Sequence, residues 1–247
     1  MLPLCFGEAT KFSQYLLDAN KTYLAVVKLG QTTTTGDSEG EILGTHPVNV
    51  NRAQVEKVLQ SLVGTVSQIP PMYSALKHQG KALYTYAREG VEIERKPREI
   101  TIYQLNLDDF SGNELSISVY CSKGTYIRVL AEDIGQALGC GAYMRALRRT
   151  VIGPFQLNQA VTLPQLEALD LAGRDGLLLP VDALIESMPK IVLDTESAYY
   201  IQQGQAIWQA KQSTGATLRL YDNQNRFLGI GEVTLDGKIA PKRLVVA

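Results

Sequence analysis

The sequence predicts an α+β protein with two domains. Stretches with apolar residues at helical spacing alternate with strand-like stretches through most of the chain. The clearest strand, residues 115–121, places apolar side chains at every second position, as a half-buried strand does. Residues 190–247 contain short strand-like pieces separated by Asn-rich and Asp-Gly turns, which predicts a small β-barrel. A length of 247 residues, 45% of them hydrophobic, is enough for one or two cores.

The first elements are a short helix, a strand and a loop. Residues 8–17 carry Ala, Phe and Leu at helical spacing and predict the helix. Residues 22–29 are rich in Tyr, Val and Leu and predict the strand. Residues 31–40 are mostly Thr, Gly and acidic residues with little hydrophobic content, so we expect a loop there.

Three further helices follow along the chain. Asn51 is the expected N-cap of the first, because Gln54 stands three residues later in the spacing of a capping box. Residues 81–89 repeat the helical pattern and stop at a glycine. Residues 126–138 predict the third helix, which also ends before a glycine.

A change of composition marks the expected domain boundary. The chain becomes Leu-rich from about residue 162, and Pro180 and Pro189 enclose a short element. We therefore expect a boundary near residue 188, which divides the chain into residues 1–188 and residues 189–247. The second of these is the domain that the turn-rich strands predict to be a β-barrel.

The net charge of −1 gives no overall attraction to nucleic acid, so RNA binding would depend on local clusters of basic residues. Three such clusters occur, in residues 77–98, 145–149 and 238–243. Each cluster taken alone has a simpler interpretation as a solvated surface. The occurrence of three clusters in one chain modestly favours binding to an anionic partner over three solvated surfaces.

Cysteine and histidine usage bears on compartment and metal binding. The three cysteines are far apart and include no Cys-x-x-Cys pair, which fits reduced thiols in the cytoplasm. His46 and His78 are the only histidines and neither has a partner at ligand spacing, so we expect no metal site. No apolar run approaches the roughly 20 residues needed to span a membrane. We expect a cytoplasmic protein without a membrane segment.

Four segments carry a resemblance to a known family: residues 1–23, 30–40, 71–90 and 122–128. The last of them, Ser-Lys-Gly-Thr-Tyr-Ile-Arg, is the most specific. Together they resemble the bacterial tRNA pseudouridine synthases of the TruB type, which modify uridine 55 in the T-loop. The resemblance implies a catalytic domain around a mixed, mostly antiparallel sheet and a PUA-like RNA-binding barrel at the C-terminus. It also implies tRNA as partner, no cofactor and a monomer.

The reaction of this family requires a carboxylate. A C–N glycosidic bond is broken, the base turns, and it is rejoined to the ribose through carbon, after the nucleotide has been pulled from its stack. In the family the carboxylate belongs to an aspartate in a Gly-x-x-Asp-Pro-x-Ala-x-Gly loop, and this motif is absent here. The resemblance puts that loop just upstream of Met1. We therefore expect an N-terminally shortened chain that is inactive by itself.

Tyr23 and Arg128 are the catalytic residues that the resemblance implies. Tyr23 matches the tyrosine placed against the target base, although its spacing alone favours a core aromatic residue at the start of a strand. Arg128 matches the arginine that pairs with the catalytic aspartate. An arginine in the first turns of a helix is repelled by the positive end of the helix dipole, so it usually pairs with an anion such as a carboxylate or a phosphate. Without the aspartate we expect an unpaired or solvent-facing guanidinium.

Asp37 and residues 71–90 are expected to meet the substrate. Asp37 lies in a loop that departs from the family form at Thr34, and it is the nearest candidate for a substitute carboxylate. Loop aspartates more often cap or turn the chain. Residues 71–90 match an insertion that closes over the T-loop. In it Tyr73, Lys77 and Lys81 would supply stacking and phosphate contacts.

The remaining substrate-binding candidates are Tyr126, Leu147 and Arg148. Tyr126 would line the same pocket as Arg128. Leu147 matches an apolar residue near the flipped base, with Arg148 beside it for phosphates; a buried strand leucine is an equally simple interpretation. Two other functions stay open. A non-catalytic tRNA-binding or tRNA-folding protein would keep the T-loop surface, whereas a protein-interaction module would leave the basic clusters solvated.

Overall fold

The structure is a computed structural model that describes residues 1–208 and 213–246. The chain divides into two compact units. The first consists of Met1 with Ala19–Ile152, and the second of Leu2–Asp18 with the chain from Gly153 onward. The domain boundary expected near residue 188 stays a prediction.

The first unit is built on an antiparallel sheet in which neighbouring strands run in the order β9-β1-β8-β7-β4. The strands are β1 (Lys21–Leu29), β4 (Gly64–Gln68), β7 (Arg98–Ser111), β8 (Glu114–Cys121) and β9 (Ala142–Ile152). Every second residue of β8 is buried, which confirms the alternation predicted for residues 115–121. In β1 the buried residues also alternate, at Ala25, Val27 and Leu29.

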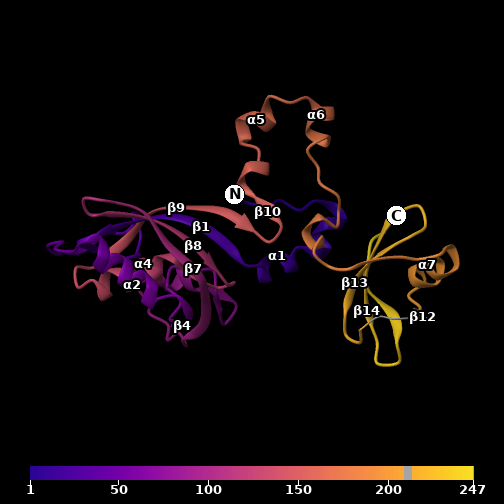
Figure 1. Ribbon diagram of the computed structural model, residues 1–247, viewed down its shortest axis with the longest axis horizontal. Helices are drawn as coiled ribbons and strands as arrows, with labels where there is room; N and C mark the ends of the chain where they lie inside the picture. The colour runs from indigo at the N-terminus through magenta and orange to yellow at the C-terminus, as the bar shows by residue number, and fades with distance from the viewer. Residues whose placement is uncertain (209–212, 247) are drawn as a thin grey trace. The chain divides into compact units, whose positions relative to one another are not determined.

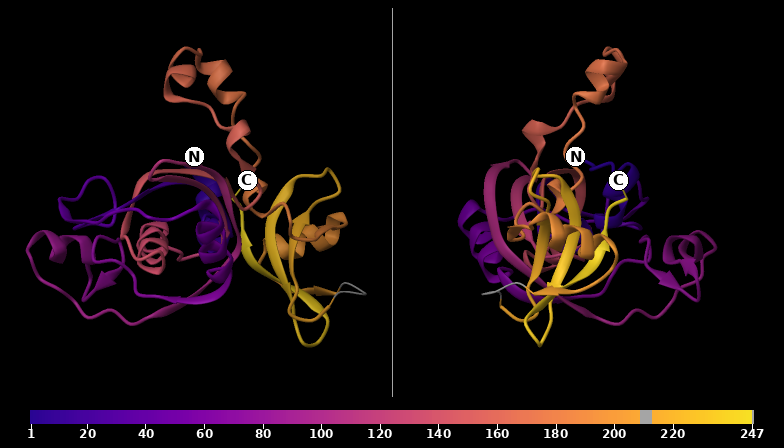
Figure 2. Two further views of the ribbon diagram at one scale, coloured as in Figure 1. Left: turned by 60° about the vertical axis from the view of Figure 1, so that its left-hand side comes forward. Right: turned by 90° about the vertical axis from the view of Figure 1, so that its right-hand side faces the viewer.

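Two helices, α2 (Arg52–Ser61) and α4 (Ile127–Ala137), pack with the sheet around one core (Figure 1). The strands curve around α4, which is seen nearly end-on in the left view of Figure 2. The capping box predicted at Asn51 is confirmed. Its side chain accepts a hydrogen bond from Gln54 N (3.0 Å), and Gln54 Oε1 accepts one from Asn51 N (2.8 Å). The α+β fold class is likewise confirmed.

Smaller elements correct two expectations. The loop expected at residues 31–40 begins as strand β2 (Gln31–Thr33), which pairs with β3 (Ile42–Thr45). The helix expected at residues 81–89 begins only at Leu83, as α3 (Leu83–Arg88). The two residues before it form β6 (Lys81–Ala82), which pairs with β5 (Lys77–His78). In both places backbone hydrogen bonding to a neighbouring segment replaces the local pattern.

The second unit contains a five-stranded sheet in the order β11-β13-β14-β15-β12. Its strands are β11 (Lys190–Val192), β12 (Ile207–Trp208), β13 (Thr217–Tyr221), β14 (Phe227–Val233) and β15 (Lys238–Leu244), accompanied by helix α7 (Thr195–Gln202). The predicted helix at residues 8–17 is divided into a 3-10 turn, η1 (Gly7–Phe12), and α1 (Gln14–Asp18). The short helices α5 (Leu163–Glu167) and α6 (Leu171–Asp175) contain no buried residue.

A buried polar group lies beside this second sheet. Arg219 Nη1 donates to Asp182 Oδ2 at 2.7 Å, and the Tyr221 hydroxyl donates to the same oxygen. Burial, followed by the hydrogen bond to Asp182, raises the pKa of Tyr221 to about 12. The neutral phenol is therefore the form that the fold stabilises.

Candidate functional site

The site begins at the turn between β8 and α4. Ser122 N donates to Thr101 O (2.8 Å), and Ser122 Oγ accepts from Thr101 N (2.9 Å), so the turn is fixed to β7. Thr125 Oγ1 donates back to Ser122 O at 3.0 Å. Gly124 has a φ of +80°, which a residue with a side chain would adopt only under strain. This tight turn places Arg128 in the first turn of α4.

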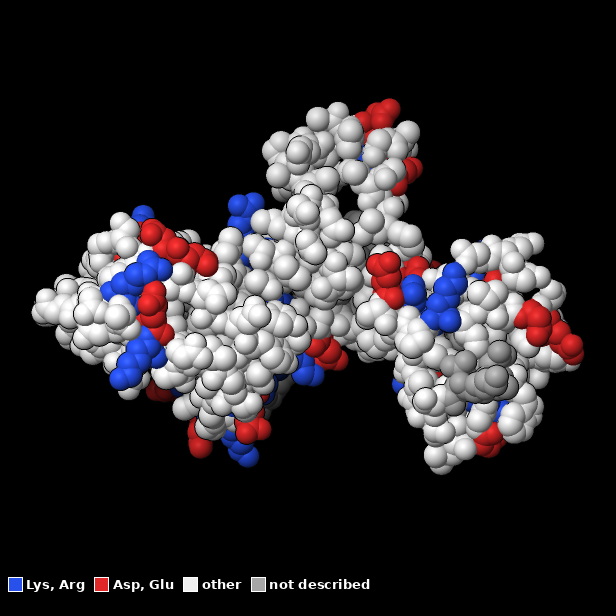
Figure 3. Space-filling view, in the orientation of Figure 1, with Lys and Arg blue, Asp and Glu red and all other residues white. Residues whose placement is uncertain are grey.

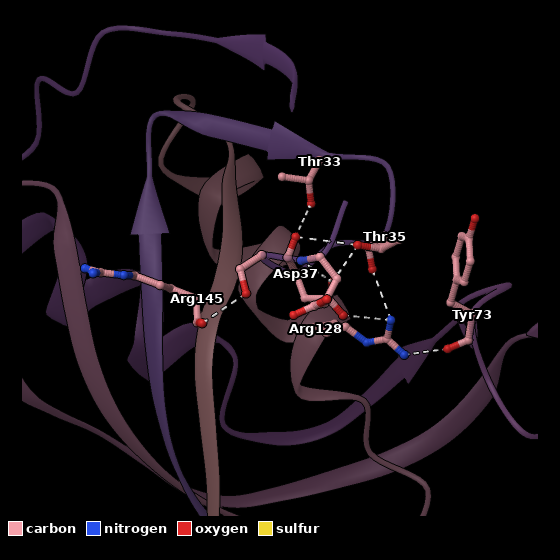
Figure 4. A network of polar contacts seen from close by, with 8 residues as sticks. Thr33, Thr35, Asp37, Tyr73, Arg128 and Arg145 are labelled. Atoms are coloured by element: carbon pink, nitrogen blue, oxygen red, sulfur yellow. Dashed lines mark hydrogen bonds and ion pairs between the residues drawn. The ribbon is translucent and has the colours of Figure 1, made fainter. Parts of the chain in front are cut away.

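Arg128 is paired with Asp37, at the centre of a polar network (Figure 4). Arg128 Nη1 donates to Asp37 Oδ2 at 3.0 Å and to Thr35 O at 3.2 Å. Arg128 Nη2 donates to the carbonyl oxygen of Tyr73. The expectation of an unpaired or solvent-facing guanidinium is therefore wrong, because a loop 91 residues away in the sequence supplies a carboxylate.

Asp37 uses both carboxylate oxygens within the protein. Oδ1 accepts from Thr35 Oγ1 (2.6 Å) and from Glu39 N (3.1 Å), while Oδ2 accepts from Arg128. Thr33 Oγ1 donates to the carbonyl oxygen of Asp37 at 2.8 Å. Only 17% of the Asp37 side chain is exposed. Asp37 therefore shapes its loop and orients Arg128.

Two predicted residues from different strands lie on one face of the sheet. In the β1–β9 pairing Tyr23 is opposite Arg149, and Ala25 is opposite Leu147. Directly opposed residues of an antiparallel pair share a face, and steps of two residues span about 7 Å. Tyr23 and Ala25 both pack with the core on the side of α4. Leu147 on this face is 44% exposed, so the interpretation as a buried strand leucine is wrong.

The same face continues to Asp37. Further along β1, Val27 is opposite Met144. Met144 forms an isolated bridge with Asp37, and its amide donates to Gly36 O at 3.0 Å. A continuous row therefore leads from Tyr23 past Leu147 and Met144 to the Asp37–Arg128 pair.

Tyr23 is half-buried at the other end of this row. Burial raises its pKa above the usual tyrosine value, while the nearby charge of Arg149 opposes that rise. The ring therefore stays neutral and presents an aromatic surface.

The predicted RNA-contacting residues of the insertion lie in different settings. The ring of Tyr73 points away from Arg128, and only its carbonyl oxygen joins the network (Figure 4). Lys77 is exposed on β5. Lys81 instead pairs with Glu89 (2.7 Å) and lies 4.6 Å from the centre of the Tyr86 ring. Lys81 is thus partly neutralised within the protein.

The two remaining candidates, Tyr126 and Arg148, lie at the start of α4 and on β9. Tyr126 is the N-cap of α4 and is partly buried. Arg148 is exposed and is opposite Leu24 on β1. Since Leu147 faces α4, its neighbour Arg148 faces the other side of the sheet. In the view of Figure 3 basic and acidic side chains are interspersed, and no large patch of one sign appears on that face.

Two residues that sequence reasoning missed support the site. Gln68 is 3% exposed and hydrogen-bonds to the backbone of Tyr126. Glu132 lies one turn after Arg128, and burial together with the charge of Asp133 raises its pKa. A Cβ atom placed on Gly36 would come within 2.9 Å of Glu132 Oε1. The four-residue spacing from Arg128 could have indicated Glu132, whereas nothing local indicates Gln68.

Within residues 1–208 and 213–246, no three His, Cys, Asp or Glu side chains gather in a way that could hold a metal ion. None of the helices described is both long enough and apolar enough to span a bilayer.

Comparison with known families assigns nearly the whole chain. A model of the TruB family pseudouridylate synthase N-terminal domain matches residues 1–127, and a model of the tRNA pseudouridylate synthase B C-terminal domain matches residues 128–186. A third, pseudouridine synthase II TruB, C-terminal, matches residues 189–245. The chain belongs to the TruB family. The residues described above therefore form the candidate site of a TruB family protein.

Curated relatives of this TruB family chain are similar over nearly its full length. A tRNA pseudouridine synthase B from Methylobacillus flagellatus is 56% identical over 245 residues, which is 99% of this chain and 81% of the relative. A protein of the same name from Nitrosospira multiformis is 52% identical over 256 residues, again 99% of this chain and 82% of the relative. The name of both relatives is that of a tRNA-modifying enzyme.

Solved structures show the same fold at low sequence identity. A Cbf5-Nop10-Gar1 complex contains a chain with a TM-score of 0.67 and 23% identity, matched over 97% of this chain and 69% of that chain. An H/ACA RNP bound to a substrate RNA gives a TM-score of 0.68 at 19% identity, over 97% of this chain and 70% of that chain. At these identities the likeness concerns the fold alone.

Proposed function

We propose that this TruB family chain acts on tRNA in the cytoplasm, as a monomer without a cofactor, in the conversion of uridine 55 of the T-loop to pseudouridine. The names of relatives that are 52–56% identical support tRNA pseudouridine formation. The observation that carries the proposal is the row from Tyr23 past Leu147 to Arg128. These residues come from two strands, β1 and β9, and from helix α4. The row combines an aromatic surface, an exposed apolar contact and a fixed cation.

These parts fit the needs of the reaction. The flipped uracil would lie against Tyr23 and Leu147, where stacking offsets the loss of its neighbours in the RNA. Arg128 has five N–H donors, and its described contacts use both on Nη1 and one on Nη2. Among the described residues, its Nε–H and second Nη2–H have no assigned acceptor. Two such donors can bind one carboxylate at both oxygens.

We further propose that the reacting carboxylate is not Asp37. Asp37 Oδ1 holds its own loop through Thr35 Oγ1 and Glu39 N, and only 17% of the side chain is exposed, which supports a structural part for this carboxylate. The 247 residues contain no Gly-x-x-Asp-Pro-x-Ala-x-Gly motif. The polypeptide of this sequence would therefore bind a T-arm and leave the uridine unchanged, and joining a segment with that motif would make it active.

A non-catalytic tRNA-binding or tRNA-folding protein is the second candidate, because it would use the same surface of Tyr23, Leu147 and Arg128. Such a protein would need the RNA surface but no reacting carboxylate. The two candidates differ in what happens when the carboxylate is supplied. A TruB-type enzyme becomes active, whereas a protein whose site has another purpose does not.

The test uses three proteins and an unmodified tRNA transcript. They are the 247-residue chain, the same chain preceded by a segment with the Gly-x-x-Asp-Pro-x-Ala-x-Gly motif of its relatives, and that second protein with Asp→Asn in the motif. T-arm affinity is measured by fluorescence anisotropy, and pseudouridine by base-specific chemical labelling. We expect all three to bind and only the second to form product, at position 55 alone.

A matched transcript with cytidine at the target position is the control for the site of modification. Turnover by the 247-residue chain would show that one of its own carboxylates reacts. Binding without turnover by the protein with the intact motif would favour the non-catalytic candidate.

A further inference from the structure

Gln68, the last residue of β4, makes a two-point contact with the start of α4. Its Oε1 accepts a hydrogen bond from Tyr126 N at 3.1 Å, and its Nε2 donates to Tyr126 O at 3.4 Å. The two residues are 58 positions apart in the sequence. Gln68 is only 3% exposed, so water does not compete for these groups.

The contact compensates for a weak helix cap. Tyr126 is the N-cap of α4, and its side chain makes no capping hydrogen bond. The first amides of a helix lack partners within the helix, so a buried helix start needs an outside acceptor. At α2 the same need is met locally, where Gln54 Oε1 accepts from the N-cap amide of Asn51. At α4 the acceptor for the N-cap amide is Gln68, which lies on a strand distant in the sequence.

The same segment is tied to α4 a second time. Five residues after Gln68, the carbonyl oxygen of Tyr73 accepts a hydrogen bond from Arg128 Nη2. Pro70 and Pro71 lie between the two points, and each proline ring fixes one backbone angle. The two prolines therefore restrict the backbone of the segment from Gln68 to Tyr73, which we call the proline strap. One end holds the backbone of Tyr126, and the other holds the guanidinium of Arg128.

We propose that Gln68 is a positioning residue for the pseudouridine synthase reaction, because its amide fixes the first turn of α4 and with it the directions of Tyr126 and Arg128. This inference rests on the proposed function. Gln68 itself contacts neither substrate nor reacting atoms. Its effect on the reaction passes through the orientation of Arg128, and a shift of about 1 Å in a catalytic group costs on the order of 100-fold in rate.

The test compares three substitutions in the protein that carries the carboxylate motif. Gln68→Met keeps the size of the side chain and removes both hydrogen bonds. Gln68→Glu keeps an acceptor for the Tyr126 amide and loses the donor to its carbonyl. Gln104→Met, at an exposed position of β7, is the matched control.

For Gln68→Met we expect kcat to fall by about 10- to 100-fold, while KM and the T-arm Kd stay within about twofold. Gln68→Glu should retain an intermediate kcat, and Gln104→Met should resemble the parent. Because the proline strap and the Arg128 contacts remain, the protein should stay folded. Hydrogen exchange of the 247-residue chain should become faster in residues 126–130 and unchanged in α2.

The outcomes separate this inference from the proposed function. If the carboxylate-bearing parent makes no pseudouridine, the proposed function fails, and hydrogen exchange alone decides whether Gln68 fixes the start of α4. Unchanged exchange at residues 126–130 in Gln68→Met overturns the inference. Faster exchange with an unchanged kcat in an active parent also overturns it, since the helix start would then have no bearing on the reaction.

Discussion

Replacing Asp37 by Asn isolates the charge of the central ion pair from the shape of its loop. The new amide oxygen can still accept from Thr35 Oγ1 and Glu39 N, as Asp37 Oδ1 does. The amide nitrogen then takes the place of Oδ2 and faces Arg128. Two donors oppose each other, and the guanidinium loses its one carboxylate partner among the described hydrogen bonds.

The expected loss of stability follows from the burial of the pair. The side chains of Arg128 and Asp37 are 20% and 17% exposed, so the pair is closer to a buried than to a surface ion pair. Breaking a buried pair costs about 3–5 kcal/mol, whereas an exposed pair contributes about 0–1 kcal/mol. The carbonyl oxygens of Thr35 and Tyr73 still bind the guanidinium. We therefore expect a decrease of about 2–3 kcal/mol in the free energy of unfolding.

Urea unfolding followed by far-UV circular dichroism measures this loss. Adding Arg128→Met to Asp37→Asn removes the unpaired charge, so the double variant should be more stable than the sum of the single effects by about 1–3 kcal/mol. Glu56→Gln, in the exposed Arg52–Glu56 pair, is the control and should cost about 0.5 kcal/mol or less. Additive effects in the double variant would refute the reasoning.

Three further predictions concern other parts of the molecule. Gly36→Ala should lower the free energy of unfolding by about 2 kcal/mol, because Gly36 has a φ of +72° and the added methyl group would contact Glu132. Adding Glu132→Ala should restore part of that loss, as measured by thermal melting. Replacing Lys77 and Arg88 together by Ala should lower the slope of log T-arm affinity against log salt by about 1.4, because each of the two phosphate contacts releases about 0.7 counterion. Stability of the second unit should fall from pH 10 to about pH 12 in denaturation experiments, because the pKa of Tyr221 is raised in the fold and the unfolded chain loses this proton first.

Each of these has a control and a contrary result. Gly112→Ala, at a φ of +60° with open space around it, measures the backbone strain alone, and an equal effect at Gly36 would exclude crowding by Glu132. An unchanged salt slope would mean that Lys77 and Arg88 do not contact phosphate. Tyr221→Phe should remove the alkaline step, and a step that persists would assign it to other groups.

Local sequence determined the elements whose stabilising contacts are local. Helix α2 was predictable because Asn51 and Gln54 complete their capping box within one turn. Strand β8 was predictable because burial on one face requires an apolar residue at every second position. The family resemblance singled out Tyr23 and Arg128 as candidate catalytic residues, which periodicity alone does not indicate.

Tertiary structure decided which groups meet. Arg128 finds its partners in Asp37 and Tyr73, at sequence distances of 91 and 55 residues, and Gln68 reaches Tyr126 across 58. Such contacts depend on the order and register of strands, which local patterns do not encode. The exposure of Leu147 opposite the buried Ala25 also depends on tertiary packing. The sequence by itself thus determined the elements with local contacts and, through resemblance, the candidate residues of the site. Folding decided the partners of those residues, because the partners come from separate strands and loops.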